Sequence, residues 1–85
     1  MTYAIDIAPA GLRSLTRLPK DIRRRVDEKI RELAAHPRPS GVKKLHGNDD
    51  LFRIPVGDYR VLYVIDDQAH RIIIRKAGHR SEIYG

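Results

Sequence analysis

The chain contains no cysteine and no tryptophan, and it has only one phenylalanine and one methionine. Without cysteine there is no disulfide, no thiolate metal site and no thiol nucleophile. The four histidines lie far apart along the sequence, with no spacing typical of a zinc site: His36, His46, His70 and His79. No apolar run approaches the roughly 20 residues of a membrane span, and the first residues lack the pattern of a secretory signal. Glycine-rich phosphate loops are absent too. We therefore expect a cytoplasmic protein that uses no metal, no cofactor and no membrane.

Positive charge is what the chain has in excess. Of its 85 residues, 17 are Lys or Arg and 11 are Asp or Glu, which gives a formal net charge of +6. A chain of this length is expected to form a single domain over residues 1–85, because domains run from roughly 50 to 250 residues. So large an excess on so small a surface predicts a polyanionic or acidic partner.

The hydrophobic pattern predicts an α+β fold. Alternating apolar residues at 3–7 indicate a strand, and Pro9 and Pro19 each stand where a helix begins, since proline is tolerated in the first helical turn. Strand patterns follow at residues 51–56, 59–65 and 71–77, with a shorter candidate at 42–45. The order of strand, helix, helix and then three or four strands predicts an antiparallel sheet with a two-helix hairpin packed on one face.

Two arginines are brought together by the expected hairpin at residues 51–65. Gly57 and Asp58 fit a two-residue turn, and such a turn fixes the register of the strands. The predicted pairs are Val56 with Tyr59, Pro55 with Arg60, Ile54 with Val61, Arg53 with Leu62 and Phe52 with Tyr63. Arg53 and Arg60 are then diagonal neighbours on one face, and the other face is wholly apolar or aromatic. The pair indicates a phosphate site, because the guanidinium fork matches phosphate oxygens. The alternative is that both arginines project into solvent.

Two further features allow a functional and a plain interpretation. His79 lies near Arg80 and Glu82, and histidine is the usual proton carrier near neutral pH. Its plain interpretation is a surface histidine in a frayed tail. The run Arg23-Arg24-Arg25 is either the solvated face of a helix, which we favour, or a partner contact.

The chain resembles the RelE branch of the RelE/ParE toxin superfamily over essentially its whole length. The resemblance is carried by three segments: Lys44-Leu45-His46-Gly47, the hairpin from Leu51 to Tyr63 with its pattern R-x-x-x-G-D-Y-R-V-x-Y, and the ending G-H-R-S-E-I-Y at residues 78–84. It implies a type II toxin, an endoribonuclease that enters the ribosomal A site and cuts messenger RNA. It also implies a cognate antitoxin, RelB-like or similar, that holds the toxin inactive.

The resemblance assigns roles to individual residues. Arg60 matches the central catalytic arginine, and Arg53 matches the basic residue at the start of the hairpin. Arg80 and Tyr84 match the arginine and tyrosine of the tail, and His79 is a candidate acid or base. Together with the charge pattern, it indicates RNA or ribosome contacts at Lys43, Lys44, Arg75 and Lys76.

One departure from the family pattern bears on the chemistry. Pro55 stands where the best-known RelE pattern has a second lysine, proposed as a base, so another group must take that role, and Glu82 and His79 are the candidates. Two other functions stay open. One is a ParE-like toxin that inhibits DNA gyrase without cleaving anything, and the other is a non-catalytic module that binds RNA or an antitoxin.

Overall fold

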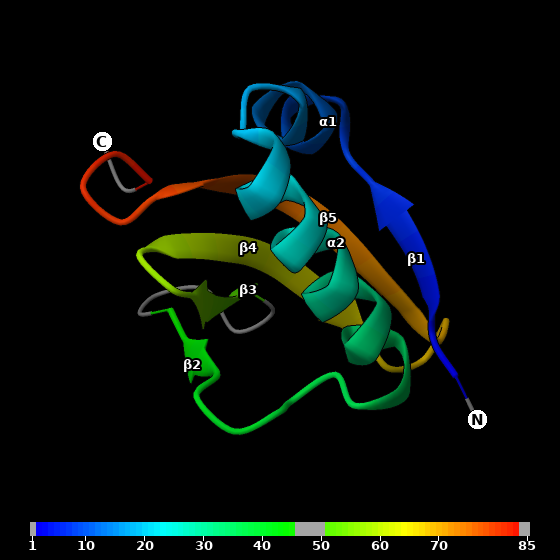
Figure 1. Cartoon of the computed structure of the whole chain (residues 1–85). Coiled ribbons are helices and arrows are strands. Elements are labelled where there is room, and N and C mark those ends of the chain that lie inside the picture. The colour runs from blue at the N-terminus through cyan, green and yellow to red at the C-terminus, as the bar shows by residue number, and fades with distance from the viewer. Residues whose placement is uncertain (1, 46–50, 84–85) are drawn as a thin grey trace.

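The computed structural model describes residues 2–45 and 51–83, and within them the chain has an α+β organisation (Figure 1). The helices are α1 (Pro9–Thr16) and α2 (Lys20–Ala35). The strands are β1 (Ala4–Ile7), β2 (Lys43–Lys44), β3 (Leu51–Val56), β4 (Tyr59–Asp66) and β5 (Arg71–His79). They form one sheet in the order β1-β5-β4-β3-β2, and the helices pack on one side of it. The predicted fold class and order of elements are confirmed.

The sheet differs from the prediction at one edge. β1 pairs with β5 in parallel, with Ala4 opposite Arg71 and Ile7 opposite Ile74, whereas the other neighbouring strands are antiparallel. The sheet is therefore mixed, and the expectation of a wholly antiparallel sheet is wrong at this strand. Apolar alternation reports which side of a strand is buried and carries no information on its direction. A parallel pair needs a long crossover, and the chain between β1 and β5 supplies it.

The helices begin where the prolines predict. Pro9 is the first residue of α1, and Pro19 is the N-cap residue immediately before α2. The apolar stripe of α2 faces the sheet, and Val26, Ile30 and Leu33 are buried there. Burial of this stripe is what fixes the rotation of α2 about its own axis.

The helix α1 covers the part of β5 that extends beyond β1. The Ala8 N–H donates to the Ile74 carbonyl at 2.9 Å, and the Ala77 N–H donates to Ser14 Oγ at 2.9 Å. Gly11 permits this approach, because a Cβ at that position would lie 2.5 Å from the Ile74 carbonyl oxygen. A hydroxyl on α1 therefore satisfies a strand N–H that would otherwise stand at a free sheet edge.

The hairpin of β3 and β4 has the predicted register, from Val56 opposite Tyr59 to Phe52 opposite Tyr63. The side toward the helices forms the core, in which six hairpin residues are at most 8% exposed: Phe52, Ile54, Val56, Val61, Tyr63 and Ile65. The opposite side of the hairpin carries Arg53, Pro55, Arg60 and Leu62, and the sheet surface to which they belong is termed the outer face.

Three side chains join the N-terminus, the connection after α2 and the β4–β5 turn. The Tyr3 hydroxyl donates to Asp67 Oδ1 at 2.7 Å, and Arg38 Nη2 donates to Asp67 Oδ2 at 2.9 Å. These two hydrogen bonds, that of Arg38 first, hold the pKa of the Asp67 carboxyl below its ordinary value. The Arg38 guanidinium also lies 5.3 Å from the centroid of the Phe52 ring, a cation–π distance. Tyr3, Arg38 and Asp67 are termed the Asp67 cluster.

Candidate functional site

Strand β5 contains a β-bulge. Leu62 on β4 is paired with Lys76, but the next residue, Tyr63, is paired with Ile74, so Arg75 is the extra residue. Regular alternation from Ile74 would turn Lys76 toward the helices. The bulge turns Lys76 to the outer face instead, which is a recognised effect of bulges near functional sites.

Four residues consequently stand in one cross-strand line on the outer face. Lys43 on β2 is opposite Arg53 on β3, Arg53 is opposite Leu62 on β4, and Leu62 is opposite Lys76 on β5. Opposite residues have their Cβ atoms about 4.5–5.5 Å apart. These four residues, three cations and a leucine, are termed the basic row. Like charges in adjacent positions repel, so the basic row favours a bound anion.

Arg60 lies beside the basic row, diagonal to Arg53 across the hairpin as the sequence predicts. Such diagonal neighbours are about 7–8 Å apart, which long side chains span. Arg60 Nη1 donates to the Gly57 carbonyl at 3.0 Å and to the carbonyl of the preceding residue, Tyr59, at 2.8 Å. These hydrogen bonds hold the half-buried Arg60 side chain at the hairpin turn. Carbonyl oxygens carry no net charge, so the guanidinium keeps its positive charge.

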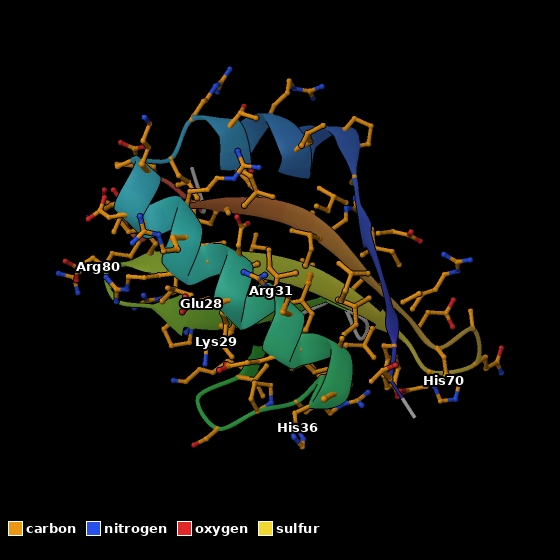
Figure 2. All side chains as sticks on the ribbon, turned by 45° about the vertical axis from the view of Figure 1, so that its right-hand side comes forward. Glu28, Lys29, Arg31, His36, His70 and Arg80 are labelled. Atoms are coloured by element: carbon orange, nitrogen blue, oxygen red, sulfur yellow. The ribbon has the colours of Figure 1, made fainter. Side chains whose placement is uncertain are left out.

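Arg80 reaches the same turn from the other direction. Its backbone N–H donates to the Asp58 carbonyl at 2.9 Å, and its Nε lies 4.0 Å from Asp58 Oδ1. The two side chains are 63% and 69% exposed, so this long ion pair contributes little to stability. Figure 2 shows Arg80 at this end of the molecule and His70 at the opposite end. The turn thus brings together Arg60 from β4 and Arg80, the residue that follows β5.

The tail after β5 folds back onto the outer face. The Glu82 and Ile83 N–H groups both donate to the His79 carbonyl, at 2.9 and 3.0 Å. Ile83 is 3% exposed and packs at Gly78, where an added Cβ would lie 3.5 Å from Ile83 Cδ1. Lys76 Nζ donates to the Ile83 carbonyl at 3.4 Å. Lys76 therefore touches both the basic row and the tail.

His79 is placed differently from the sequence-based expectation. It is the last residue of β5 rather than a residue beyond the strand, and it is paired with Tyr59 on the side that faces the helices. The two rings are 5.4 Å apart in an edge-to-face arrangement. The Ser81 N–H donates to His79 Nδ1 at 3.1 Å, so the neutral ring carries its proton on Nε2. The ladder places His79 on the opposite face of the sheet from Arg53 and Arg60.

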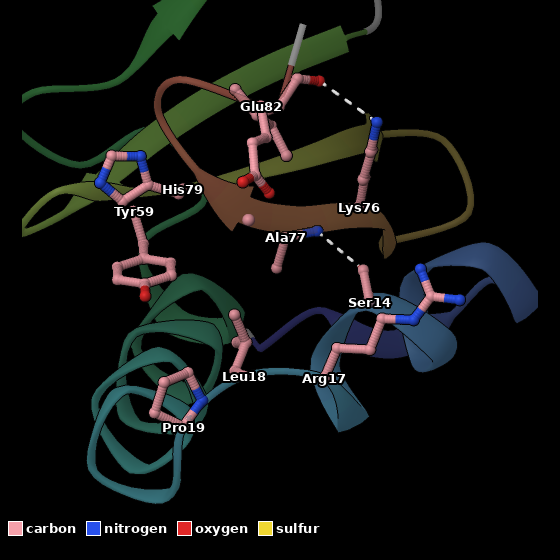
Figure 3. Close-up of a pocket in the computed structure, with 11 residues that line it drawn as sticks. Ser14, Arg17, Leu18, Pro19, Tyr59, Lys76, Ala77, His79 and Glu82 are labelled. Carbon is pink, nitrogen blue, oxygen red and sulfur yellow. Dashed lines mark hydrogen bonds between the residues drawn. The ribbon is translucent and has the colours of Figure 1, made fainter. Parts of the chain in front are cut away.

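His79 and Glu82 line the same hollow at the end of β5, shown in Figure 3. Its volume is about 470 Å³. The other lining residues come from α1, the connection to α2, β4, β5 and the tail after β5: Ser14, Arg17, Leu18, Pro19, Tyr59, Lys76, Ala77, Gly78 and Ile83. The structure therefore gathers Arg53, Arg60 and Lys76 on the outer face, and it places His79 and Glu82 in a hollow at the sheet edge that Lys76 also lines.

The remaining predicted residues are distributed as follows. Lys43 and Arg75 are exposed, and Lys44 is paired with Phe52, which places it on the other side of β2 from Lys43. Tyr84 lies outside the described residues. Sequence reasoning counts Lys76 only as a general RNA contact, although a signal for its position exists. The two consecutive cations Arg75 and Lys76 interrupt the alternation of β5, whose buried residues fall at 72, 74 and 77, and the step from two to three is the spacing that a bulge produces.

Neither a metal-binding cluster nor a membrane-spanning helix is present in the part of the chain that the structure describes. Residues 2–45 and 51–83 contain no group of three or more His, Asp or Glu side chains arranged to hold a metal ion. Neither helix among them is long and apolar enough to cross a membrane.

Comparison of the sequence and the fold with known proteins finds that this chain is similar to toxins. The sequence model of the family described as ParE toxin of type II toxin-antitoxin system matches residues 5–84. Toxin RelE of Mycobacterium tuberculosis is 34% identical over 83 residues, which are 96% of this chain and 86% of that protein. Toxin RelG of the same organism is 31% identical over 85 residues, covering 99% of this chain and 98% of that one. The RelE chain of the archaeal RelE–RelB complex from Pyrococcus horikoshii superposes with a TM-score of 0.82 at 36% identity, over 96% of this chain and 99% of that one.

Proposed function

Because the chain belongs to the RelE/ParE toxin superfamily and is a RelE-like toxin of a toxin–antitoxin system, we propose that it is an endoribonuclease that cuts messenger RNA in the ribosomal A site. One observation carries the proposal. Arg53 and Arg60 are diagonal neighbours on the outer face, and Arg80 reaches the turn that holds Arg60. A gyrase inhibitor that acts by binding has no need of such a convergent set.

The proposed reaction is metal-independent. The ribose 2′-oxygen bonds to the adjacent phosphorus while the bond from phosphorus to the 5′-oxygen breaks. A base takes the 2′-hydroxyl proton, and an acid gives a proton to the departing 5′-oxygen. The products are a cyclic 2′,3′-phosphate and a free 5′-hydroxyl. Negative charge builds up on the phosphoryl oxygens in the transition state, and cations aimed at that charge supply most of the catalysis.

The cations are assigned by their position. Arg53 and Arg60 would hold the scissile phosphate, and Arg80 would add positive charge in the transition state. Lys43, Lys44, Arg75 and Lys76 would contact the RNA backbone or the ribosome, with affinity that falls as salt rises.

The proton carriers are assigned to the end of β5. We propose His79 as acid or base, and Glu82 as the alternative base in place of the group missing at Pro55. Tyr84, which lies outside the described residues, would stack on or orient a base. The geometry supports the arginine set more strongly than these carriers, because His79 faces the helix side of the sheet.

The proposed partners follow from the same surface. The toxin would act in the cytoplasm on ribosome-bound message, without a cofactor. A RelB-like antitoxin would keep it inactive, as the pairing of RelE with RelB in the Pyrococcus horikoshii complex suggests by analogy.

The test is cleavage of a translated message by purified ribosomes in the presence of the toxin. Wild type should cut the message, and Arg60→Ala should lower the cleavage rate by about 10²–10³. Arg24→Ala is the matched control, since Arg24 is an exposed arginine on α2 and its loss changes the net charge equally. Intact message with the wild type would overturn the proposal.

A second candidate is inhibition of DNA gyrase, which the ParE family match over residues 5–84 favours. It predicts that the wild type blocks supercoiling of a relaxed plasmid by gyrase and leaves message intact. Block of supercoiling that survives Arg60→Ala, with no cleavage, would establish this reading in place of the ribonuclease.

A further inference from the structure

The bulge in β5 gives Lys76 a position that the family pattern does not assign. Arg75 is the extra residue, and through it Lys76 is paired with Leu62 on the outer face. We propose that Lys76 contacts the scissile phosphate and forms, with Arg53 and Arg60, a three-cation site around Leu62. This inference rests on the proposed ribonuclease function and deepens it, since it adds a residue to the reacting site.

The strand pairing is symmetric about Leu62. Arg53 on β3 and Lys76 on β5 are both directly opposite Leu62, and Arg60 precedes Leu62 by two residues on β4. Arg60 is therefore the diagonal neighbour of both, at about 7–8 Å. Neighbouring strands are about 4.8 Å apart, which sets the backbones at Arg53 and Lys76 about 10 Å apart. A phosphate above Leu62 is within reach of all three long side chains.

The surface beside Lys76 is hollowed. A hollow of about 290 Å³ opens on the outer face and is lined by Ala10, Leu51, Leu62, Arg75 and Lys76. Leu62 is only 8% exposed, so the floor of this hollow is apolar and packed. Charges act more strongly beside an apolar floor than in open water. The hollow leaves space for a nucleotide next to the ammonium.

A hydrogen bond to the tail already holds the Lys76 side chain in place. Its Nζ donates to the Ile83 carbonyl at 3.4 Å, and an ammonium has three donors, so two remain for phosphate oxygens. A side chain with one hydrogen bond in place loses less conformational entropy when it binds a phosphate. Pro55 on β3 is directly opposite Arg60 and carries no charge. Lys76 on β5, the strand on the other side of β4, supplies a positive charge near Arg60.

Lys43 supplies a matched control within the same row. It is opposite Arg53, as Leu62 is, but it lies on the edge strand β2, two strands away from Arg60. Lys43 is exposed, and a phosphate held between Arg53 and Arg60 would lie beyond it. Loss of Lys43 should therefore act on RNA binding.

The experiment is single-turnover cleavage of message on ribosomes, with the toxin–ribosome dissociation constant measured separately. Lys76→Ala should lower the cleavage rate constant by about 10²–10³. Its toxin–ribosome dissociation constant should rise no more than that of Lys43→Ala. Arg24→Ala removes the same charge at an exposed position on α2 and should cleave at the wild-type rate. Lys76→Gln keeps a donor for the Ile83 carbonyl and should be as slow as Lys76→Ala, and Lys76→Arg, which keeps the charge, should recover most of the rate.

Thermal unfolding separates chemistry from folding. Unchanged melting of Lys76→Gln together with slow cleavage would support the three-cation site. Cleavage by Lys76→Ala and Lys76→Gln at the rate of Arg24→Ala would overturn it while leaving the ribonuclease intact. Absence of cleavage by the wild type would overturn the ribonuclease itself, and this inference with it.

Discussion

Arginines at the two ends of the sheet have different hydrogen-bond partners. At the end that holds the β4–β5 turn, Arg38 binds Asp67 at 2.9 Å and Arg71 binds Asp6 at 2.6 Å. At the end that holds the β3–β4 turn, Arg60 binds the carbonyls of Gly57 and Tyr59. There Arg80 Nε lies 4.0 Å from Asp58 Oδ1, and both side chains are exposed.

This difference separates cations that stabilise the fold from cations available to a polyanion. An arginine bound to a carboxylate is neutralised, and it connects two segments of chain. An arginine bound to a carbonyl keeps its full charge and is already oriented. The positive charge of Arg60 is therefore available at the hairpin end of the outer face.

The largest expected effect is on cleavage, at the hairpin end. Arg53→Ala should lower the single-turnover rate by about 10²–10³. The double variant Arg53→Ala/Arg60→Ala should lose much less than the product of the two single losses, because both side chains hold one phosphate. Arg71→Ala, at the other end, should leave the rate unchanged. Fully multiplicative losses would contradict a shared phosphate, and slow cleavage by Arg71→Ala would break the contrast between the ends.

The next effect is on stability. The Tyr63 hydroxyl donates to the Pro37 carbonyl at 2.8 Å, and burial raises the pKa of Tyr63 from about 10 to about 12. Because the folded pKa lies above the unfolded one, the neutral hydroxyl stabilises the fold fully below the unfolded pKa, and this stability is lost as pH rises toward 12.

Tyr63→Phe should therefore lower the free energy of unfolding at neutral pH by about 0.5–1.5 kcal/mol. Its stability should also fall less than that of the wild type in alkaline solution. Urea unfolding over a series of pH values measures both effects. The cleavage rate at neutral pH should not change, and an alkaline loss of equal size in both proteins would show that Tyr63 is not its source.

The hairpin could be predicted from sequence because its determinants are local. A two-residue turn at Gly57 and Asp58 fixes which residues are opposite, and alternation then assigns each to a face. The pairing of Arg53 and Arg60 follows from these two facts alone. The helix starts at Pro9 and Pro19 were predictable for the same reason.

The remaining features depend on contacts distant in sequence. The parallel pairing of β1 and β5 joins residues more than sixty positions apart and leaves no mark on alternation. The bulge at Arg75 changes the phase of β5, and this shift decides the faces of both Lys76 and His79. Sequence reasoning that treats His79 as part of a loose tail cannot assign it a face, and so it groups His79 with arginines that lie on the other side of the sheet.

A smaller effect concerns binding at the edge of the basic row. Lys43→Ala should reduce the slope of log affinity against log salt by about 0.7, the value for one phosphate contact on single-stranded RNA. Fluorescence anisotropy with a short single-stranded RNA measures this slope. Lys29→Ala is the control, since Lys29 lies on α2 and is paired with Glu32 at 3.0 Å. Equal slopes for the two variants would remove Lys43 from the RNA surface.

The smallest effect is expected at the Asp67 cluster, whose members lie at the surface. Hydrogen bonds from Arg38 and Tyr3 lower the pKa of Asp67, so the carboxylate stabilises the fold above its ordinary pKa. That contribution is lost as pH falls through the lower, folded pKa. Asp67→Asn should thus melt slightly earlier than the wild type at neutral pH, and the two melting curves should converge in strongly acid solution. A difference that persists in acid would mean that Asp67 acts through its shape rather than its charge. Slower cleavage by this variant would mean that the charge-matched end also serves the site, and the division between the two ends would fail.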